Sequence, residues 1–342
     1  MSVKRLDKHL SLVVDMYGCP NRCRHCWLGH MPNRRMEEGA DEWIFRYFEP
    51  YFENITFYSW LREPDYCDDY RERWSRDIRL SRGIMPRRFE LGSFWRIVRD
   101  EQYVKFLKEV GVQKVQLTFF GLEEFTDLYV GRKGAFRELI QTTQILIENG
   151  ITPRWQAFIN EENKDEVVQL LPLIEDMKLY ERCEGLDAPF SFFVHAGSCD
   201  GENRKLYDIR IKKQDIPQEL IPCFLHYEDT KTEREWCELL GAEESNVVYH
   251  NEGEIVLNIS NRYDVFFNFT HMSPNWRIGN LKTDGRDELI RRILEEDTQA
   301  LNLARNITLR ELVEKYGDPR SDRAFERGDY TGYLLNCYVD GR

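Results

Sequence analysis

The chain has 342 residues, of which 42% are hydrophobic and 13% aromatic, enough for one large core or for a large and a smaller core. Lysine and arginine number 48 against 60 aspartates and glutamates, so the formal charge is −12. No basic run of the kind that follows a phosphate backbone stands out. We therefore do not expect a nucleic acid partner.

The first twelve residues carry several charges, and the apolar stretch that follows is interrupted by Asp15. A signal peptide needs a longer uncharged run, and no segment approaches the ~18 apolar residues of a membrane helix. We therefore expect a cytoplasmic protein without a membrane segment. In that compartment nine cysteines favour metal or redox chemistry over a disulfide framework.

Segments of strand length alternate with segments of helical spacing over the first two hundred residues. The expected strands are residues 10–16, 54–60, 87–94, 113–120, 154–160 and 189–197. Such alternation is typical of parallel βα units. It predicts an α/β fold, either a partial (βα)6 TIM-like barrel or an open parallel sheet. Ligands of such sheets bind at the carboxyl ends of the strands.

From about residue 200 the pattern changes to short strands separated by polar turns. Residues 246–250, 254–260 and 264–270 indicate an antiparallel sheet. Helices are expected at 284–297 and 308–316, and the second opens with Thr308 and Glu311 at capping-box spacing. We therefore assign residues 1–200 to a core domain and 201–342 to a smaller α+β domain.

A cysteine loop follows the first expected strand directly. Cys19, Cys23 and Cys26 are separated by three and two residues, so that one loop offers three thiolates to one metal centre. Cubane electron carriers use four cysteines, and three leave one iron open to a substrate or cofactor. A chance cluster or a zinc site completed by His25 or His30 is the alternative. A zinc site usually has a second Cys-x-x-Cys pair, which this sequence does not contain.

This loop resembles the signature of the radical S-adenosylmethionine (SAM) superfamily, and the resemblance extends over at least residues 10–200. It implies a 4Fe–4S cluster whose open iron binds the amino and carboxylate groups of SAM. Reductive cleavage of SAM would give methionine and a 5′-deoxyadenosyl radical that abstracts hydrogen from an unactivated carbon. It also implies an electron donor such as flavodoxin or ferredoxin, and a small-molecule or peptide substrate.

The resemblance assigns two residues near the cysteine loop to the SAM site. His25 stands where the family usually has an aromatic residue against SAM; a solvated loop histidine is the alternative. Residues 61–64, Leu-Arg-Glu-Pro, stand where the family often has Gly-Gly-Glu-Pro. Glu63 would supply the anion that the SAM ammonium needs, unless it belongs to a plain surface turn.

Further SAM contacts are implied on the next strands. Thr118 matches a serine that the family has at a strand end, and Arg132 or Arg154 would replace the family's arginine. A solvated Arg-Lys pair is the alternative for Arg132. Along the strand at 154–160, Arg154, Gln156 and Asn160 share one face because side chains alternate with a period of two. Polar residues facing a barrel interior are costly unless they bind a ligand or one another.

The second domain resembles a SPASM or twitch extension, a type that normally holds auxiliary clusters. Asn268 stands where such domains commonly have a cysteine, and the remaining C-terminal cysteines show no close pair. We therefore expect one cluster only, which favours rearrangement, epimerisation or coupling over oxidation. Epimerisation needs a hydrogen donor, and Cys199 or Cys223 could provide it; buried structural cysteines are the alternative. We expect His195 to be a core or rim histidine.

Two classes of function remain at this point. The first is an enzyme acting on a small metabolite, favoured over peptide maturation because the 18 residues before Cys19 leave no room for a leader-binding domain. The second is a non-catalytic iron–sulfur or zinc protein. Cleavage of SAM by the reduced protein would distinguish them.

Overall fold

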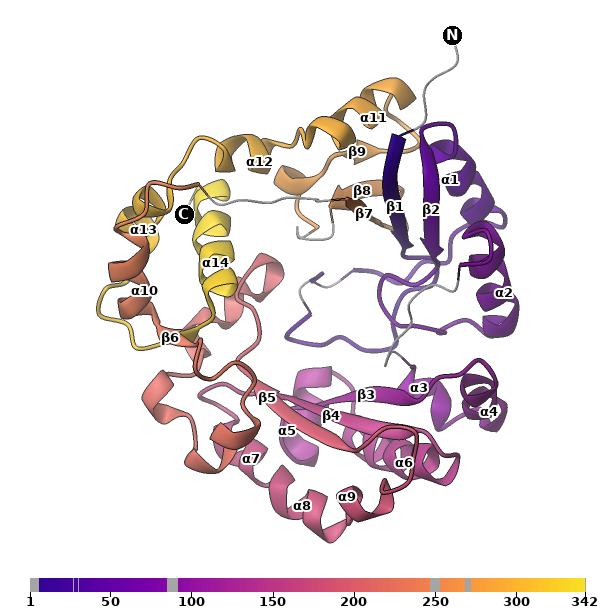
Figure 1. Cartoon of the computed structure of the whole chain (residues 1–342), viewed down its shortest axis with the longest axis vertical. Coiled ribbons are helices and arrows are strands. Elements are labelled where there is room, and N and C mark those ends of the chain that lie inside the picture. The colour runs from indigo at the N-terminus through magenta and orange to yellow at the C-terminus, as the bar shows by residue number, and fades with distance from the viewer. Residues whose placement is uncertain are drawn as a thin grey trace. The chain divides into compact units, whose positions relative to one another are not determined.

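The computed structural model describes residues 6–26, 28–29, 31–84, 92–246, 253–267 and 272–341. The chain divides into two compact units, each built from segments distant in sequence. The first unit comprises Met1–Pro20, His30–Arg87 and Asn246–Ile307, and the second comprises Asn21–Gly29, Arg88–Ser245 and Thr308–Arg342. Figure 1 labels their helices and strands.

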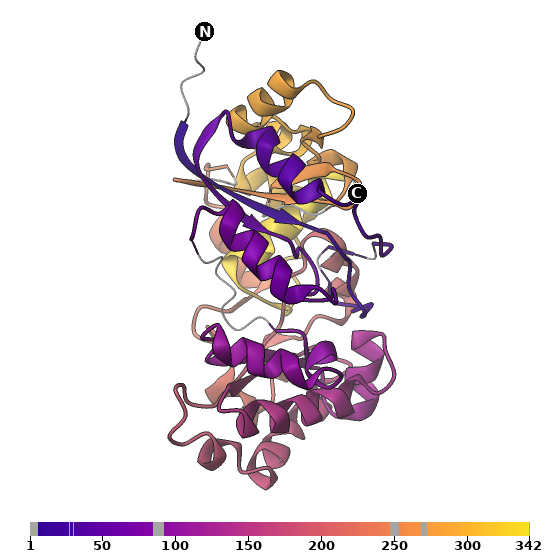
Figure 2. The same cartoon turned by 90° about the vertical axis from the view of Figure 1, so that its right-hand side faces the viewer.

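The first unit contains one five-stranded sheet with the order β2-β1-β7-β8-β9. Its strands are β1 (Leu6–Val14), β2 (Phe52–Tyr58), β7 (Glu254–Ile259), β8 (Asp264–Phe267) and β9 (Gly279–Asn280). Its helices are α1 (Ala40–Phe48), α2 (Tyr70–Leu80), α11 (Arg286–Glu295) and α12 (Gln299–Ala304), with a 3₁₀ turn, η4, at Pro274–Trp276. Helices α1 and α2 cover one face of β1 and β2 (Figures 1 and 2).

Strand β1 lies between two parallel neighbours. Leu12 is in register with Phe57 of β2 on one side and with Leu257 of β7 on the other. All three side chains are fully buried. Residues 10–14 of β1, in which Ser11 is the one polar residue, suit a strand inside a covered parallel sheet. Strands β7 and β8 then form the expected antiparallel pair.

The second unit contains a three-stranded parallel sheet with the order β3-β4-β5 and a two-stranded sheet of β6 and β10. The strands are β3 (Lys114–Phe119), β4 (Thr152–Phe158), β5 (Ser191–His195), β6 (Lys231–Thr232) and β10 (Ala324–Phe325). The α-helices are α3 (Phe94–Ile97), α4 (Glu101–Glu109), α5 (Glu123–Val130), α6 (Ala135–Glu148), α7 (Lys164–Val168), α8 (Leu170–Asp176), α9 (Leu179–Arg182), α10 (Glu233–Leu240), α13 (Leu309–Tyr316) and α14 (Arg327–Val339). The 3₁₀ segments are η1 (Gly201–Ile209), η2 (Lys213–Asp215) and η3 (Gln218–Cys223).

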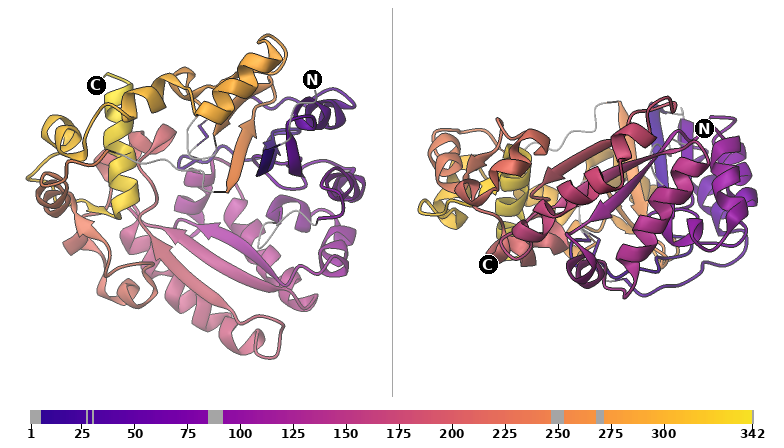
Figure 3. Two further views of the ribbon diagram at one scale, coloured as in Figure 1. Left: turned by 45° about the horizontal axis from the view of Figure 1, so that its top comes forward. Right: turned by 90° about the horizontal axis from the view of Figure 1, so that it is seen from below.

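Helices α6 to α9 cover one face of the three-stranded sheet (Figure 3). Trp155 of β4 is fully buried, stacks on Phe119 of β3, and donates its indole N–H to Thr143 of α6 over 3.0 Å. Because the indole N–H has this partner, the largest side chain of the sheet is buried without an unsatisfied donor.

Most expected elements are confirmed at nearly the expected bounds. The expected strand at 87–94 lies for the most part outside the described residues, and Phe94 itself begins α3. Residues 247–250 of the expected strand at 246–250 and Asn268 also lie outside them. The capping box at the start of α13, Thr308 with Glu311, is confirmed.

The compact units do not follow the expected boundary at residue 200. Strands β7 and β8, which we expected in a separate sheet, extend the sheet of β1 together with β9. Strand β5 and helix α14, which lie on opposite sides of the expected boundary, belong to the same unit. The physical reason is pairing: β1 offers a second edge, and β7 satisfies its backbone groups. The assignment of 1–200 and 201–342 to a core and a cap stays a prediction.

Candidate active site

Cys19 belongs to the first unit and is held by its backbone. Asn33 accepts a hydrogen bond from the Cys19 N–H at 3.0 Å and donates one to the Cys19 carbonyl at 2.8 Å. The Cys19 Sγ lies 3.9 Å from Oε2 of Glu63, which lies in the turn after β2. The structure therefore brings together one expected metal ligand and the carboxylate expected to bind the SAM ammonium.

Cys23 and Cys26 belong to the second unit, where their loop lies on the end of α5. The N–H groups of Arg22 and Arg24 donate to the carbonyls of Val130 and Tyr129 at 3.0 and 2.8 Å. Gly131 has a φ of +71°, and a Cβ there would lie 2.6 Å from the Arg22 carbonyl oxygen. Because Gly131 has no Cβ, the cysteine loop can lie close to the end of α5.

Arg132 also anchors this loop. Its Nε donates to Oδ1 of Asn21 at 2.9 Å, and its Nη2 forms an ion pair of 2.7 Å with Glu138. The sequence predicts that either Arg132 or Arg154 holds SAM. In the structure the guanidinium of Arg132 holds the residue that begins the second-unit part of the cysteine loop.

His25 packs among aromatic rings at the ends of β3 and β4. Its ring centroid lies 4.5 Å from that of Phe120 and 4.7 Å from that of Phe158. Burial, with a smaller effect of His195, lowers the pKa of His25 to about 3. The ring is therefore neutral at physiological pH, and its buried Nδ1 has no hydrogen-bond partner in the described structure. The alternative of a solvated loop histidine is not what the structure shows.

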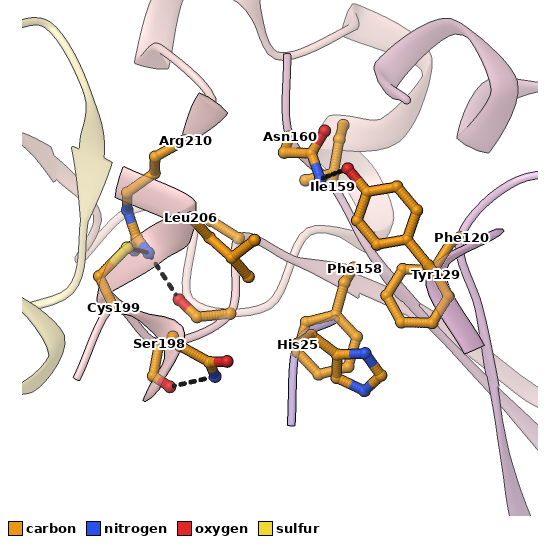
Figure 4. Close-up of a pocket in the computed structure, with 13 residues that line it drawn as sticks. His25, Phe120, Tyr129, Phe158, Ile159, Asn160, Ser198, Cys199, Leu206 and Arg210 are labelled. Atoms are coloured by element: carbon orange, nitrogen blue, oxygen red, sulfur yellow. Dashed lines mark hydrogen bonds between the residues drawn. The ribbon is translucent and has the colours of Figure 1, made fainter. Parts of the chain in front are cut away.

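A small cavity in the second unit adjoins His25 (Figure 4). The residues that line it lie at the ends of β3 and β4 and in the segment after β5. They include Phe158, Asn160, Cys199 and Arg210. The enclosed space is about 20 Å³, which suffices for one water molecule. A larger ligand therefore requires the lining side chains to move.

Cys199 is 1% exposed and lines this cavity. Nη1 of Arg210 donates to its Sγ at 3.2 Å and to the Gly197 carbonyl at 2.8 Å, while Asp329 balances the guanidinium at 3.3 Å. Burial raises the pKa of Cys199 more strongly than Arg210 lowers it. Cys199 is thus a protonated thiol at neutral pH.

Cys223, the other candidate hydrogen donor, has a different environment. It ends η3, is only half-buried, and donates its S–H to the Leu220 carbonyl at 3.2 Å. Burial raises the pKa of Cys223 as well. Because the residues lining the cavity include Cys199 and not Cys223, the two candidates are no longer equivalent.

The remaining expected contacts lie on β3 and β4. Thr118 is in register with Gln156, whose amide donates to the His195 ring at 2.7 Å. The guanidinium of Arg154 lies 4.5 Å from the ring centre of Phe193. Asn160 lines the cavity and donates to the Tyr129 hydroxyl at 2.8 Å. Of these residues, Asn160 is the one that reaches the cavity.

The donor set fits an iron–sulfur cluster chemically. Three thiols come from one loop whose backbone is anchored on both sides, and each is partly exposed. Within the described ranges no three His, Cys, Asp or Glu side chains are gathered closely enough to hold a metal ion. Thiolates bind metal only after losing their protons, and metal binding often completes the fold of its site. The assignment of these cysteines as ligands therefore stays a prediction.

Sequence reasoning missed several residues that line the cavity, among them Asn203 and Arg210. Asn203 is 5% exposed, and its Oδ1 has no hydrogen-bond partner in the described structure. Both lie on or just after η1, a segment of irregular 3₁₀ turns whose side-chain directions no sequence period reveals. The sequence feature that could have drawn attention to this segment is the high density of charged residues after Cys199.

Comparisons with known proteins support the family resemblance that the cysteine loop indicates. Residues 13–173 match the family model of the Radical SAM superfamily. Fe-coproporphyrin III synthase of Methanosarcina barkeri (strain Fusaro / DSM 804) is 31% identical over 98 residues, 29% of this chain. The match spans 23% of that relative's length.

The fold resembles solved structures over nearly the whole chain. The structure of native anSMEcpe with bound AdoMet, which is SAM, has a TM-score of 0.52 at 14% identity and covers 97% of both chains. The structure of the same protein with AdoMet and the Kp18Cys peptide has a TM-score of 0.51, again at 14% identity and 97% of both chains. The expected α/β partial barrel is thereby confirmed.

None of the helices that the structure describes is long and apolar enough to cross a membrane. The matched family segment contains all three loop cysteines, Glu63 and Asn160. Enzymes of this superfamily use a 4Fe–4S cluster together with SAM, the cofactor pair that the cysteine loop led us to expect. Residues 13–173 of the chain therefore carry the characteristic domain of the radical SAM superfamily.

Proposed function

We propose that this enzyme removes a hydrogen atom from an unactivated carbon of a small metabolite and returns one to the product from a thiol. The conversion of substrate to product is then redox-neutral, such as an epimerisation or a rearrangement, while the external donor supplies the electrons that cleave SAM and restore the thiol. The observation that supports the proposal most is the position of Cys199, which lines one cavity with His25.

In this proposal Cys19, Cys23 and Cys26 bind the cluster, and Glu63 binds the SAM ammonium beside Cys19. The bound cluster and SAM supply the 5′-deoxyadenosyl radical that takes the substrate hydrogen. The ring of His25, which packs against Phe120 and Phe158, offers a flat surface for a cofactor. Asn160 and the unpaired Oδ1 of Asn203 offer polar contacts to a ligand in the cavity.

Cys199 has the properties that a hydrogen-atom donor requires. Its raised pKa keeps the S–H bond intact at neutral pH, and Arg210 fixes the sulfur without removing that proton. When the thiol gives its hydrogen atom to a carbon radical, the S–H bond breaks and a C–H bond forms. The sulfur radical left behind then takes one electron and one proton. A reduced ferredoxin- or flavodoxin-type donor supplies the electron.

Peptide modification is the second candidate. It is favoured by the fold likeness to anSMEcpe, whose structure was solved with a bound peptide. The cavity of about 20 Å³ holds one water molecule and must open for a substrate of either kind, so its volume favours neither candidate. The two candidates differ in the size of the molecule that increases SAM cleavage.

The proposal is tested anaerobically in D₂O with the reduced enzyme, SAM and either a small-molecule or a peptide fraction from cells. We expect a small-molecule fraction to raise the formation of 5′-deoxyadenosine above the rate without substrate. The product should carry one deuterium from the exchanged thiol and no other change in composition. Cys199→Ala should abolish this deuterium incorporation, whereas Cys223→Ala should retain it. Stimulation by the peptide fraction alone, or deuterium in the Cys199→Ala product, would contradict the proposal.

A further inference from the structure

A buried ion pair lies at the ends of β1 and β2. Nε and Nη2 of Arg62 bind the two carboxylate oxygens of Asp15 at 3.0 and 2.9 Å. The two side chains are 7% and 1% exposed. Arg62 replaces one of the two glycines that the family often has before the SAM-binding glutamate, here Glu63. Arg62, which departs from the family pattern, thus has a structural role as the partner of Asp15.

The same guanidinium reaches the segment after the cysteine loop. Nη1 of Arg62 donates to the Met31 carbonyl at 2.8 Å, and Nη2 lies 3.4 Å from the Pro32 carbonyl. Asn261, in the turn between β7 and β8, donates to the Pro32 carbonyl at 3.1 Å. The next residue, Asn33, holds both backbone polar groups of Cys19. A chain of hydrogen bonds therefore leads from Asp15 to Cys19.

Gly18 makes this arrangement possible. Its φ is +96°, and a Cβ on it would lie 2.3 Å from Oδ1 of Asn33 and 3.0 Å from Nη2 of Arg62. Its N–H donates to Oδ1 of Asp15 at 3.2 Å. The residue before Cys19 is thus packed directly against the ion pair and its hydrogen-bonded neighbour.

A buried ion pair contributes little net stability, because the cost of desolvating both ions offsets their attraction. Its geometric effect is larger, since a bidentate arginine fixes both the distance and the direction of its partner. Here the Asp15–Arg62 pair fixes the chain segment between β1 and Cys19 relative to the turn that contains Glu63. Neighbours of this kind commonly tune the affinity of a metal site.

We propose that Asp15, Arg62 and Asn33 are positioning residues that hold Cys19 beside Glu63 and thereby set the affinity of the site for SAM. Arg62 acts through Asp15 and the 31–33 segment and does not itself contact SAM. In this enzyme the ion pair fixes the backbone beside Glu63, where the family often has two glycines. This inference rests on the proposed roles of Cys19 and Glu63.

The test compares Arg62→Lys, Asn33→Ala and Arg286→Lys with the wild-type enzyme after anaerobic cluster reconstitution. Lysine keeps the charge and loses the bidentate geometry. Asn33 is exposed, so Asn33→Ala removes the Cys19 contacts at little risk to folding. Arg286 is a matched control in the same unit, because it also binds two backbone carbonyls, those of Arg46 and Tyr47. The readouts are iron content, the change that SAM causes in the EPR spectrum of the reduced cluster, and KM and kcat for SAM cleavage without substrate.

We expect Arg62→Lys and Asn33→Ala to raise the KM for SAM, and the SAM concentration that gives half the EPR change, by about tenfold. Iron content and kcat should change much less, and Arg286→Lys should match the wild type. Arg62→Gly with Asp15→Asn restores one family glycine without leaving a buried anion unpaired, and it too should weaken SAM binding.

The inference is overturned if Asn33→Ala and Arg62→Lys bind SAM as the wild type does, or if Arg286→Lys changes SAM binding equally. It is also overturned if the glycine variant binds SAM more tightly. A wild-type protein that takes up no iron and cleaves no SAM would instead refute the proposed function, so the two failures are distinguishable.

Discussion

Leu12 of β1 lies in register with Leu257 of β7, in a parallel pair of strands that joins the beginning of the chain to its last third. Both side chains are fully buried. The strand that precedes the Cys19 loop is therefore supported on one side by β2 and on the other by β7, a strand that the sequence predicts in a separate sheet.

Leu12→Ala and Leu257→Ala should each lower the free energy of unfolding by about 2–5 kcal/mol, because each leaves a cavity in a closed core. Since the two side chains are neighbours, the double variant should depart from additivity by about 0.5–3 kcal/mol. Chemical denaturation of the four proteins measures this coupling. Leu12→Ala combined with Leu117→Ala, in the three-stranded sheet, is the additive control. Additive losses for Leu12 and Leu257 would contradict the pairing.

The fold could be predicted from the sequence where hydrophobic pattern and length agree. The segments around Leu12, Leu117 and Trp155 are apolar, of strand length and followed by helical spacing, and each forms a strand. What the pattern could not provide was the partner of β7. A strand's period defines its faces and not which neighbour completes its hydrogen bonds, so the antiparallel hairpin was expected correctly while its place beside β1 was not.

The candidate site divides in a similar way. Cys19 and His25 could be proposed because they lie in one short motif, and Glu63 because it lies in a second short motif, residues 61–64. Arg62 was read only as a missing glycine, because the carboxylate that binds it, Asp15, follows a different strand. Asn203 was missed because no motif contains it.

The stability of the second unit should decrease on mild acidification because of His195. Burial lowers the pKa of His195 to about 4, below the value of about 6.5 in an unfolded chain. Between these values the unfolded state binds the proton and the folded state does not, so stability is present above pH 6.5 and is lost as pH falls toward 4. From about pH 7.5 to about pH 5.5 this amounts to about 1 kcal/mol.

Chemical denaturation of the wild type and His195→Asn at both pH values checks this effect. Asparagine keeps a hydrogen-bond partner for Gln156, so the variant should fold. Its loss of stability between the two pH values should be smaller by the same amount. Equal losses in both proteins would show that His195 does not carry the pH dependence.

Cys199 should react with iodoacetamide much more slowly than Cys223 in the native enzyme. Cys199 is 1% exposed, whereas Cys223 is only half-buried, and alkylation requires an accessible thiolate. We expect the rates, measured by mass spectrometry of the labelled peptides under anaerobic conditions, to differ at least about tenfold. Similar rates would place Cys199 at the surface and remove the main support for its role as a hydrogen donor.

The reconstituted enzyme should contain about four irons per chain, as one cubane cluster requires. Replacing Cys19, Cys23 or Cys26 by alanine should remove most of this iron. The Cys237→Ala variant should retain it, because the Cys237 thiol forms a hydrogen bond of 3.1 Å with the Tyr330 hydroxyl and is not a predicted ligand. Iron and sulfide analysis measures the content. About eight irons in the wild type would show that the chain also holds an auxiliary cluster.

The most direct test of the central claim is the formation of 5′-deoxyadenosine by the reduced, cluster-loaded protein incubated anaerobically with SAM. Our account predicts that the wild type forms it and that the variant with Cys19, Cys23 and Cys26 all replaced by alanine forms none. If the loaded wild type neither binds nor cleaves SAM under these conditions, or if the triple variant cleaves it equally well, the three-cysteine loop is not the catalytic centre.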